Sequence, residues 1–191
     1  MSLYLVRHGE TEWSRSGQHT SVTDLPLLPE GERGARSLAP WLAETTFAQV
    51  LTSPRQRARR TAELAGFGDA KVDDDLAEWS YGDYEGLTTE EILQRDAGWT
   101  IWEGVTPGGE TPQQVTERLD RVVASARAAD GDTLVFAHGH ILCALAARWL
   151  GEPVRSGRFF RLGTSSLSVL SAYHEQPVVQ VWNASPPPLA P

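Results

Sequence analysis

The residues that could do chemistry begin directly after an apolar run near the start of the chain. Residues 3–6 (Leu-Tyr-Leu-Val) are typical of a buried strand, and Arg7, His8 and Gly9 follow without a break. An imidazole can accept a phosphoryl group covalently, which divides one displacement into two easier ones. A neighbouring guanidinium has forked donors that bind phosphate oxygens in pairs. Arg7 and His8 together therefore suit the transfer of a phosphoryl group.

A second apolar run ends in the same kind of residue. Residues 133–137 (TLVFA) are followed by His138, Gly139 and His140. Ligands of open α/β sheets bind beyond the carboxyl ends of the strands, so we expect His8 and His138 to meet in one crevice. Each histidine alone could be a hydrogen-bonded strand cap, but the matched pair favours a shared site. The glycines let the backbone turn and approach a ligand closely.

A third candidate segment is residues 53–61 (SPRQRARRT), which follow a strand and open a helix. Backbone N–H groups and the helix dipole favour an anion at such a position. The four arginines at positions 55, 57, 59 and 60 cannot all face one way on a helix. We expect one or two of them to point into the crevice and the others to be solvated.

The composition is that of an ordinary globular protein with 191 residues, 40% hydrophobic and 22% charged, which suits one domain with a core. Its net charge of −8 argues against nucleic acid as a partner. No apolar run has the length of a membrane helix, and no signal peptide is evident, so we expect no membrane partner and a cytoplasmic location. The single cysteine, Cys143, excludes an internal disulfide, and its apolar neighbours predict buried filler.

Strands alternate with helices, which predicts an α/β fold: a single domain with a mostly parallel central sheet and helices on both faces. We expect strands at residues 3–6, 48–52, 71–73, 133–137, 158–162, 166–172 and 178–182. We expect helices at residues 29–45, with Pro40 as a kink or early stop, and at 55–65, 88–96, 112–129 and 141–150. The domain should span residues 1–184, and the proline-rich residues 185–191 should form a disordered tail.

These motifs resemble those of the histidine phosphatase superfamily, also called phosphoglycerate mutase-like, which has the fold just described. The family's Arg-His-Gly signature corresponds to residues 7–9, in the longer form RHGETEW. Its Ser-x-x-x-Arg-Ala-x-x-Thr block corresponds to residues 53–61, its Leu-x-Glu block to residues 76–86 (LAEWSYGDYEG), and its second histidine motif to His138-Gly139. The stretches at 13–27, 73–86 and 136–140 are most similar to sedoheptulose-bisphosphatase-like members, although Ser21 stands where those have glycine.

The resemblance implies a phosphatase that needs neither a cofactor nor a metal. It makes His8 the nucleophile, and Arg7, Arg57 and His138 the groups that clamp the phosphoryl group. It makes Glu78 the proton donor to the leaving oxygen and later the base for water. The substrate is then a small phosphate ester, a sugar phosphate or bisphosphate, and a family-like homodimer is allowed. Residues expected to contact the substrate are Ser14, Gln18, His19, Thr20, Gly139, His140 and Trp102.

A phosphoglycerate mutase is the nearest alternative. Mutases of this family place basic residues in the insertion after the catalytic glutamate, whereas residues 87–112 contain only Arg95 against five carboxylates. We expect this acidic insertion to repel a bisphosphoglycerate and to favour hydrolysis. Its Trp99 and Trp102 could either pack as a lid or stack on a sugar face.

Two further alternatives come from other classes of protein. A zinc site built from His8, His138 and His140 would leave Arg7 and Arg57 unexplained, because cations beside a metal are unfavourable. A non-catalytic phosphate-binding protein would need neither a nucleophile nor an acid. Both are therefore disfavoured.

Overall fold

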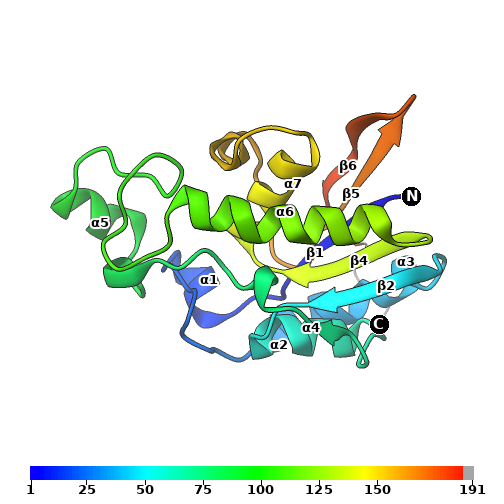
Figure 1. Cartoon of the computed structure of the whole chain (residues 1–191). Helices are drawn as coiled ribbons and strands as arrows, with labels where there is room; N and C mark the ends of the chain where they lie inside the picture. Colours follow the sequence, from blue (N-terminus) through cyan, green and yellow to red (C-terminus); the bar gives the residue numbers. More distant parts are fainter. Residues whose placement is uncertain (187–191) are drawn as a thin grey trace.

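The computed structural model describes residues 1–186 and contains one six-stranded sheet, in the order β3-β2-β4-β1-β5-β6 (Figure 1). β3, β2, β4 and β1 are parallel, β5 is antiparallel to β1, and β6 is antiparallel to β5. The strands are β1 (Leu3–Arg7), β2 (Phe47–Thr52), β3 (Lys71–Val72), β4 (Asp132–Ala137), β5 (Leu167–Tyr173) and β6 (Gln176–Ala184). The predicted mostly parallel sheet is confirmed.

Helices cover both faces of the sheet, as predicted. In Figure 1, α6 and α7 lie on one side of the strands, and α2 and α4 lie on the other. Because side chains alternate along a strand, Leu3 and Leu5 of β1 join the apolar cluster under α6 and α7, whereas Val6 joins the opposite cluster with Leu38 and Ala62. The helices are α1 (Glu12–Ser16), α2 (Pro29–Ser37), α3 (Ala39–Leu42), α4 (Gln56–Leu64), α5 (Thr89–Arg95), α6 (Pro112–Ala128) and α7 (Gly139–Trp149).

The strand predicted at residues 158–162 is wrong. A 3₁₀ helix, Val154–Phe159, occupies the start of this stretch, and the chain then continues to β5 without strand pairing. The backbone of Gly157 packs so closely on the indole of Trp102 that a Cβ would lie 2.5 Å from the ring. This packing on a distant tryptophan is a tertiary contact that the local sequence of residues 158–162 does not reveal.

The segment 29–45 is divided into two helices, so the predicted single helix is also corrected. α2 ends at Ser37, and Pro40 lies in the first turn of α3, where a missing N–H costs no helical hydrogen bond. The short helix α1 was not predicted, and a capping box between Thr11 and Ser14 begins it.

The predicted tail falls largely outside the described residues, which end at 186, and the domain boundary at 184 stays a prediction. Within residues 1–186, no helix has both the length and the apolar character needed to cross a membrane.

The loop that precedes Glu78 is anchored on α6 by Arg118. The Arg118 side chain is only 9% exposed, and its Nη1 donates to the carbonyls of Asp75 (2.6 Å) and Ala77 (2.8 Å). Its Nε pairs with Glu110 at 2.8 Å. One guanidinium thus holds the two carbonyl groups that set the path of the chain into Glu78.

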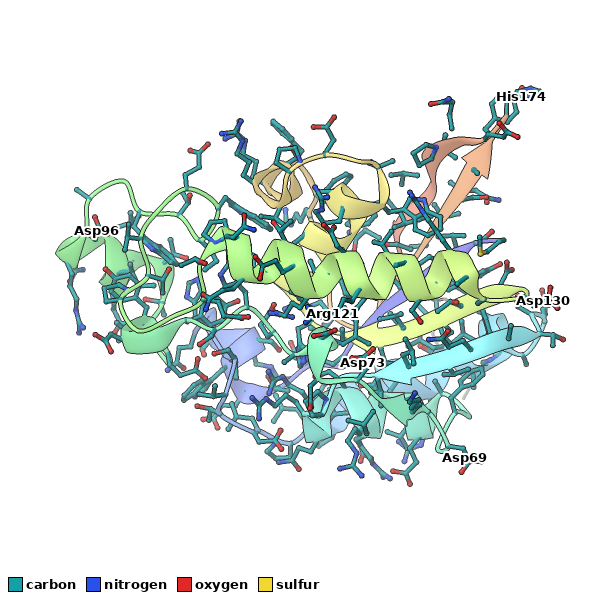
Figure 2. The ribbon with its side chains drawn as sticks, viewed as in Figure 1. Asp69, Asp73, Asp96, Arg121, Asp130 and His174 are labelled. Atoms are coloured by element: carbon teal, nitrogen blue, oxygen red, sulfur yellow. The ribbon has the colours of Figure 1, made fainter. Side chains whose placement is uncertain are left out.

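Arg118→Ala should lower the free energy of unfolding by about 2–3 kcal/mol, because it leaves the carbonyls and the Glu110 carboxylate without their partner. Urea denaturation followed by tryptophan fluorescence would measure the change. The control is Arg121→Ala on the same helix (Figure 2), because the exposed Arg121 pairs only with the Asp75 side chain and the Glu117 carbonyl. Its effect should be much smaller. Equal effects would contradict the anchoring role of Arg118.

Candidate active site

Parallel strands that end at the same level bring the two predicted histidines together. Arg7 of β1 lies opposite Ala137 of β4, and the N–H of His8 donates to the Ala137 carbonyl at 3.0 Å. The rings of His8 and His138 meet edge to face, with centroids 5.2 Å apart. The two imidazoles are therefore in contact at the carboxyl ends of β1 and β4, with His8 in the cavity wall and His138 behind it.

His8 is 5% exposed and keeps one ring nitrogen free. Its Nδ1 lies 2.7 Å from the Gly9 carbonyl oxygen, and because a carbonyl only accepts, Nδ1 carries the proton. Nε2 therefore retains its lone pair. Burial, together with the charges of Arg7 and Arg57, holds the pKa of His8 well below its usual range. A neutral imidazole with an available lone pair is the form that nucleophilic attack requires.

Arg7 lies in the wall of the same cavity as His8, and not all of its N–H groups are hydrogen-bonded. Its Nη1 donates to the Leu162 carbonyl at 2.5 Å, whereas its buried Nε has no hydrogen-bond partner within residues 1–186. Gly139 allows the guanidinium to lie against the start of α7, since a Cβ there would be 3.4 Å from Cζ. A buried guanidinium with an unpaired N–H suits an anion such as phosphate.

Glu78 supplies a buried carboxyl group that lines the cavity with His8. Oε1 accepts the N–H groups of Ile141 (2.8 Å) and Trp79 (2.9 Å), and Oε2 accepts that of His140 (3.1 Å). Burial raises the pKa of Glu78, although these three hydrogen bonds oppose the change. The carboxyl group is held in one orientation and can hold or release a proton at the cavity.

The resemblance implies that Arg57 and His138 contact the phosphoryl group, but the structure places both behind the cavity wall. Arg57 is fully buried, with Nε donating to His138 Nδ1 at 3.1 Å and Nη1 donating to the Thr23 carbonyl at 2.9 Å. Since His138 accepts at Nδ1, its proton lies on Nε2, which is 2.7 Å from Ser53 Oγ. Neither Arg57 nor His138 lines the cavity; the charge of Arg57 lowers the pKa of His8, and the ring of His138 packs against the His8 ring.

Arg57 also fixes the loop of residues 18–24, which forms part of the cavity wall. Its Nη2 donates to the Thr20 carbonyl at 3.2 Å. Ser21 ties the same loop to the chain beyond Glu78, because its hydroxyl donates to Glu85 Oε2 at 2.5 Å and its N–H donates to Oε1 at 2.9 Å. The serine at position 21 is therefore a link between two loops and does not line the cavity.

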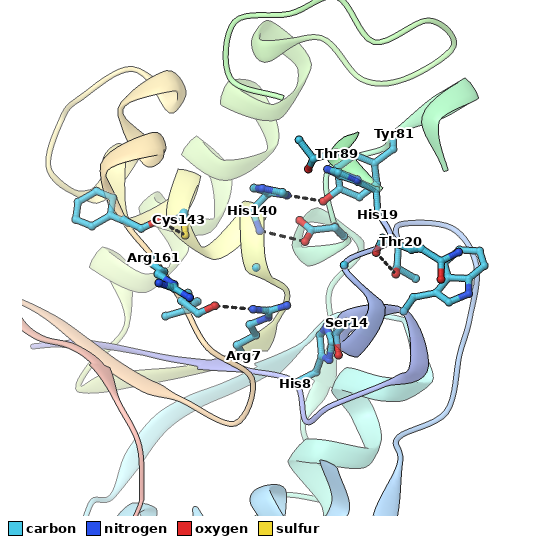
Figure 3. A pocket seen from close by; sticks show the side chains of 17 residues that line it. Arg7, His8, Ser14, His19, Thr20, Tyr81, Thr89, His140, Cys143 and Arg161 are labelled. Atoms are coloured by element: carbon cyan, nitrogen blue, oxygen red, sulfur yellow. Dashed lines mark hydrogen bonds between the residues drawn. The ribbon is translucent and has the colours of Figure 1, made fainter. Parts of the chain in front are cut away.

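The cavity has a volume of about 340 Å³ and extends from His8 along the start of α7 (Figure 3). Six of the predicted substrate contacts line it: Ser14, Gln18, His19, Thr20, Gly139 and His140. Trp102 does not, because its ring packs against His140 (centroids 5.3 Å apart) and Trp79 (5.8 Å) in the core. Stacking of Trp102 on a substrate is therefore not supported.

One wall of the cavity is polar but uncharged. His140 Nδ1 lies 2.6 Å from the Tyr81 hydroxyl oxygen, and burial lowers the pKa of His140 to about 3. His19 donates from Nδ1 to the Leu87 carbonyl at 2.8 Å, and burial lowers the pKa of His19 too. Both rings are thus neutral, and such donors and acceptors suit the hydroxyl groups of a sugar.

Several cavity residues escaped the sequence analysis, namely Trp13, Tyr81, Thr89, Phe160 and Arg161. Tyr81 lies inside the Leu-x-Glu block, so this motif could have identified it as a cavity residue. Nothing local marks Arg161, whose segment the sequence assigns to a strand. Cys143 also lines the cavity, and burial raises the pKa of its thiol to about 12, which agrees with an inert filler.

The insertion of residues 87–112 contributes only Thr89 to the cavity wall. Its carboxylates point elsewhere, and Glu103 and Glu110 pair with Arg158 and Arg118. The repulsion expected from this acidic segment therefore does not act at the cavity wall. Within residues 1–186, no group of three histidine, cysteine or carboxylate side chains is placed to hold a metal ion.

Comparison with known proteins agrees with this geometry. Residues 3–185 match the histidine phosphatase superfamily (branch 1). An acid phosphatase of Mycobacterium tuberculosis is 39% identical over 176 residues, which cover 90% of this chain and 87% of that protein. Sedoheptulose 1,7-bisphosphatase of Saccharomyces cerevisiae is 41% identical over 184 residues, with 79% of this chain and 68% of that protein covered. A solved structure of an open reading frame from Mycobacterium tuberculosis has a TM-score of 0.92 at 37% identity, covering 96% of this chain and 97% of that chain. With a match along nearly its whole length and the signature residues gathered around one cavity, the chain belongs to the histidine phosphatase superfamily.

Proposed function

We propose that this protein is a phosphatase that hydrolyses a small sugar phosphate or bisphosphate through a phosphohistidine at His8. The observation that carries the proposal is the neutral His8, with a free Nε2, in one cavity with Arg7 and Glu78. The acid phosphatase and the sedoheptulose bisphosphatase among its relatives support phosphate esters as substrates. The uncharged wall around His19 and His140 supports a substrate rich in hydroxyl groups.

In the first step, His8 Nε2 attacks phosphorus and the bond from phosphorus to the ester oxygen breaks. Glu78 gives its proton to the departing oxygen, so the alcohol leaves neutral. Arg7 donates to the phosphoryl oxygens, and Arg57 adds positive charge from behind the wall. The ring becomes cationic as the N–P bond forms, and the hydrogen bond from Nδ1 to the Gly9 carbonyl stabilises that charge.

In the second step, water attacks the phosphorus from the side that the alcohol has left. Glu78, now a carboxylate, takes a proton from the water. The N–P bond breaks, its electron pair returns to Nε2 of His8, and inorganic phosphate departs. Both residues are then in their starting protonation states.

The opposite pKa shifts of His8 and Glu78 make this cycle possible. Free histidine and glutamic acid have pKa values of about 6.5 and 4.3, so neutral histidine and protonated glutamic acid would rarely coexist without a shift. Burial lowers the pKa of His8 and raises that of Glu78. Both shifts therefore increase the fraction of molecules in which neutral His8 and protonated Glu78 coexist.

The insertion supports hydrolysis over a mutase reaction. Mutases of this family bind the substrate with basic residues in this segment, but here Arg95 does not line the cavity. Thr89 is the only contribution of the insertion to the wall, so this segment brings no positive charge to the cavity.

His8→Ala should abolish turnover, because no neighbouring group can replace the nucleophile. A brief incubation of the parent protein with ³²P-labelled sugar phosphate, quenched in base, should trap an acid-labile phosphoenzyme. The variant should trap none. Label that persists in the variant would rule out His8 as the attacking group.

Glu78→Gln should separate the two steps. A sugar alkoxide needs a proton to leave, so hydrolysis of sugar phosphates should slow by roughly 10²–10⁴. Nitrophenolate leaves without a proton, so p-nitrophenyl phosphate should still load His8 and then stall for lack of a base. Stopped-flow absorbance should show a burst of one nitrophenol per active site. A uniform loss on both substrates without a burst would instead show that Glu78 has a structural role and is not the proton donor.

Arg57→Ala should lower kcat/KM by roughly 10²–10³, because it removes charge behind His8 and the anchor of His138. Arg60 on the same helix is the matched control, since it is partly exposed and pairs with Glu32 and Glu63. Arg60→Ala should change kcat/KM little. Similar losses in both variants would show that the effect of Arg57→Ala is not specific to the inward face of α4.

A further inference from the structure

The cavity contains a second cation, Arg161, which the proposed reaction does not use. Arg161 has an exposed side chain and lines the cavity. Figure 3 shows it on the same side of the cavity as Arg7, with His19 and Thr20 on the other side. The carbonyl of the next residue, Leu162, accepts a hydrogen bond from Arg7 at 2.5 Å, so this segment borders the phosphate-binding guanidinium.

The backbone that carries Arg161 is held in place. Trp182 of β6 donates from its indole Nε1 to the Arg161 carbonyl at 2.7 Å. The neighbouring Phe160 packs on the same indole, with ring centroids 4.7 Å apart. The guanidinium of Arg161 therefore extends from a fixed base at the mouth of the cavity.

The charges that line the cavity do not balance. Among the described residues that line the cavity, Arg7 and Arg161 are the arginines and Glu78 is the one carboxylic acid. No carboxylate within residues 1–186 forms an ion pair with Arg161, whereas Arg158, three residues earlier, pairs with Glu103. The phosphoryl group at His8 is met by Arg7, so Arg161 is left without an anionic partner.

We propose that Arg161 binds a second anionic group of the substrate, a phosphate or a carboxylate at the end away from His8. The inference rests on the proposed phosphatase function and makes the enzyme selective for esters with a second anionic group. A guanidinium fork binds either anion through two charge-assisted hydrogen bonds. Hydrogen bonds to charged groups strengthen binding by about tenfold to a hundredfold. The exposed position also means that the attraction should weaken as salt is added.

The test measures binding in the His8→Ala variant, which cannot consume the ligand. Calorimetry would give Kd for fructose 1,6-bisphosphate and 3-phosphoglycerate, with fructose 6-phosphate, which has a single anionic group, as the reference. We expect at least one ligand with two anionic groups to bind about tenfold or more tightly than the reference. Arg161→Gln should remove this advantage and change the Kd of the reference less than twofold.

Two further variants sharpen the result. Arg158→Gln removes a cation that is already paired and lies off the cavity, so all three Kd values should stay unchanged. Arg161→Lys keeps the charge but not the fork and should retain part of the advantage. Equal weakening of all three ligands by Arg161→Gln, or no weakening of any, would overturn the inference. The proposed function is checked separately by phosphate release from p-nitrophenyl phosphate in the parent protein, and its failure would leave the binding result to stand alone.

Discussion

The hydrogen bond from the His8 amide to the Ala137 carbonyl continues the β1–β4 ladder one residue beyond β1. This hydrogen bond fixes the relative positions at which the chain leaves β1 at His8 and leaves β4 at His138. β2 pairs with the other edge of β4, and the Ser53 amide donates to the Phe136 carbonyl at nearly the same level. The segments that lead into α4 and α7 therefore start side by side. A slip of one residue would exchange the side chains that face the two apolar clusters on either side of the sheet, so the packing of both clusters maintains the geometry of the site.

Burial also decides the protonation states on which the chemistry depends. It lowers the pKa values of His8 and His138 and raises that of Glu78. Arg7 and Arg57 keep their charge in the same environment, and an uncompensated buried charge is unfavourable. A phosphate dianion supplies the missing negative charge. The cationic groups are in place before the substrate arrives, and the site is stabilised most when an anion binds to it.

Much of the sheet and the catalytic centre could be predicted, because both leave local signals. Apolar runs that end in histidine revealed β1 and β4, and helical spacing located α4, α6 and α7. Features decided by distant packing could not be predicted. Trp102 lies in the core because Gly157 lets the backbone approach it. Arg161 reaches the cavity because Trp182 of the last strand holds its carbonyl. The spacing of residues 53–61 did not show that Arg57 donates its hydrogen bonds to the Thr23 carbonyl and to His138 Nδ1.

The position of β1 between β4 and β5 has a consequence for synthesis of the protein on the ribosome. β1 is synthesised before its partner strands β4 and β5, which begin at Asp132 and Leu167. Its apolar side chains therefore stay unpaired until most of the chain has been made. At typical rates of translation this wait is on the order of ten seconds. The pairs that complete the centre of the sheet are therefore non-local, and such pairing is slow to form. A nascent chain stalled before β4 would carry His8 without the strand whose pairing positions it in the sheet.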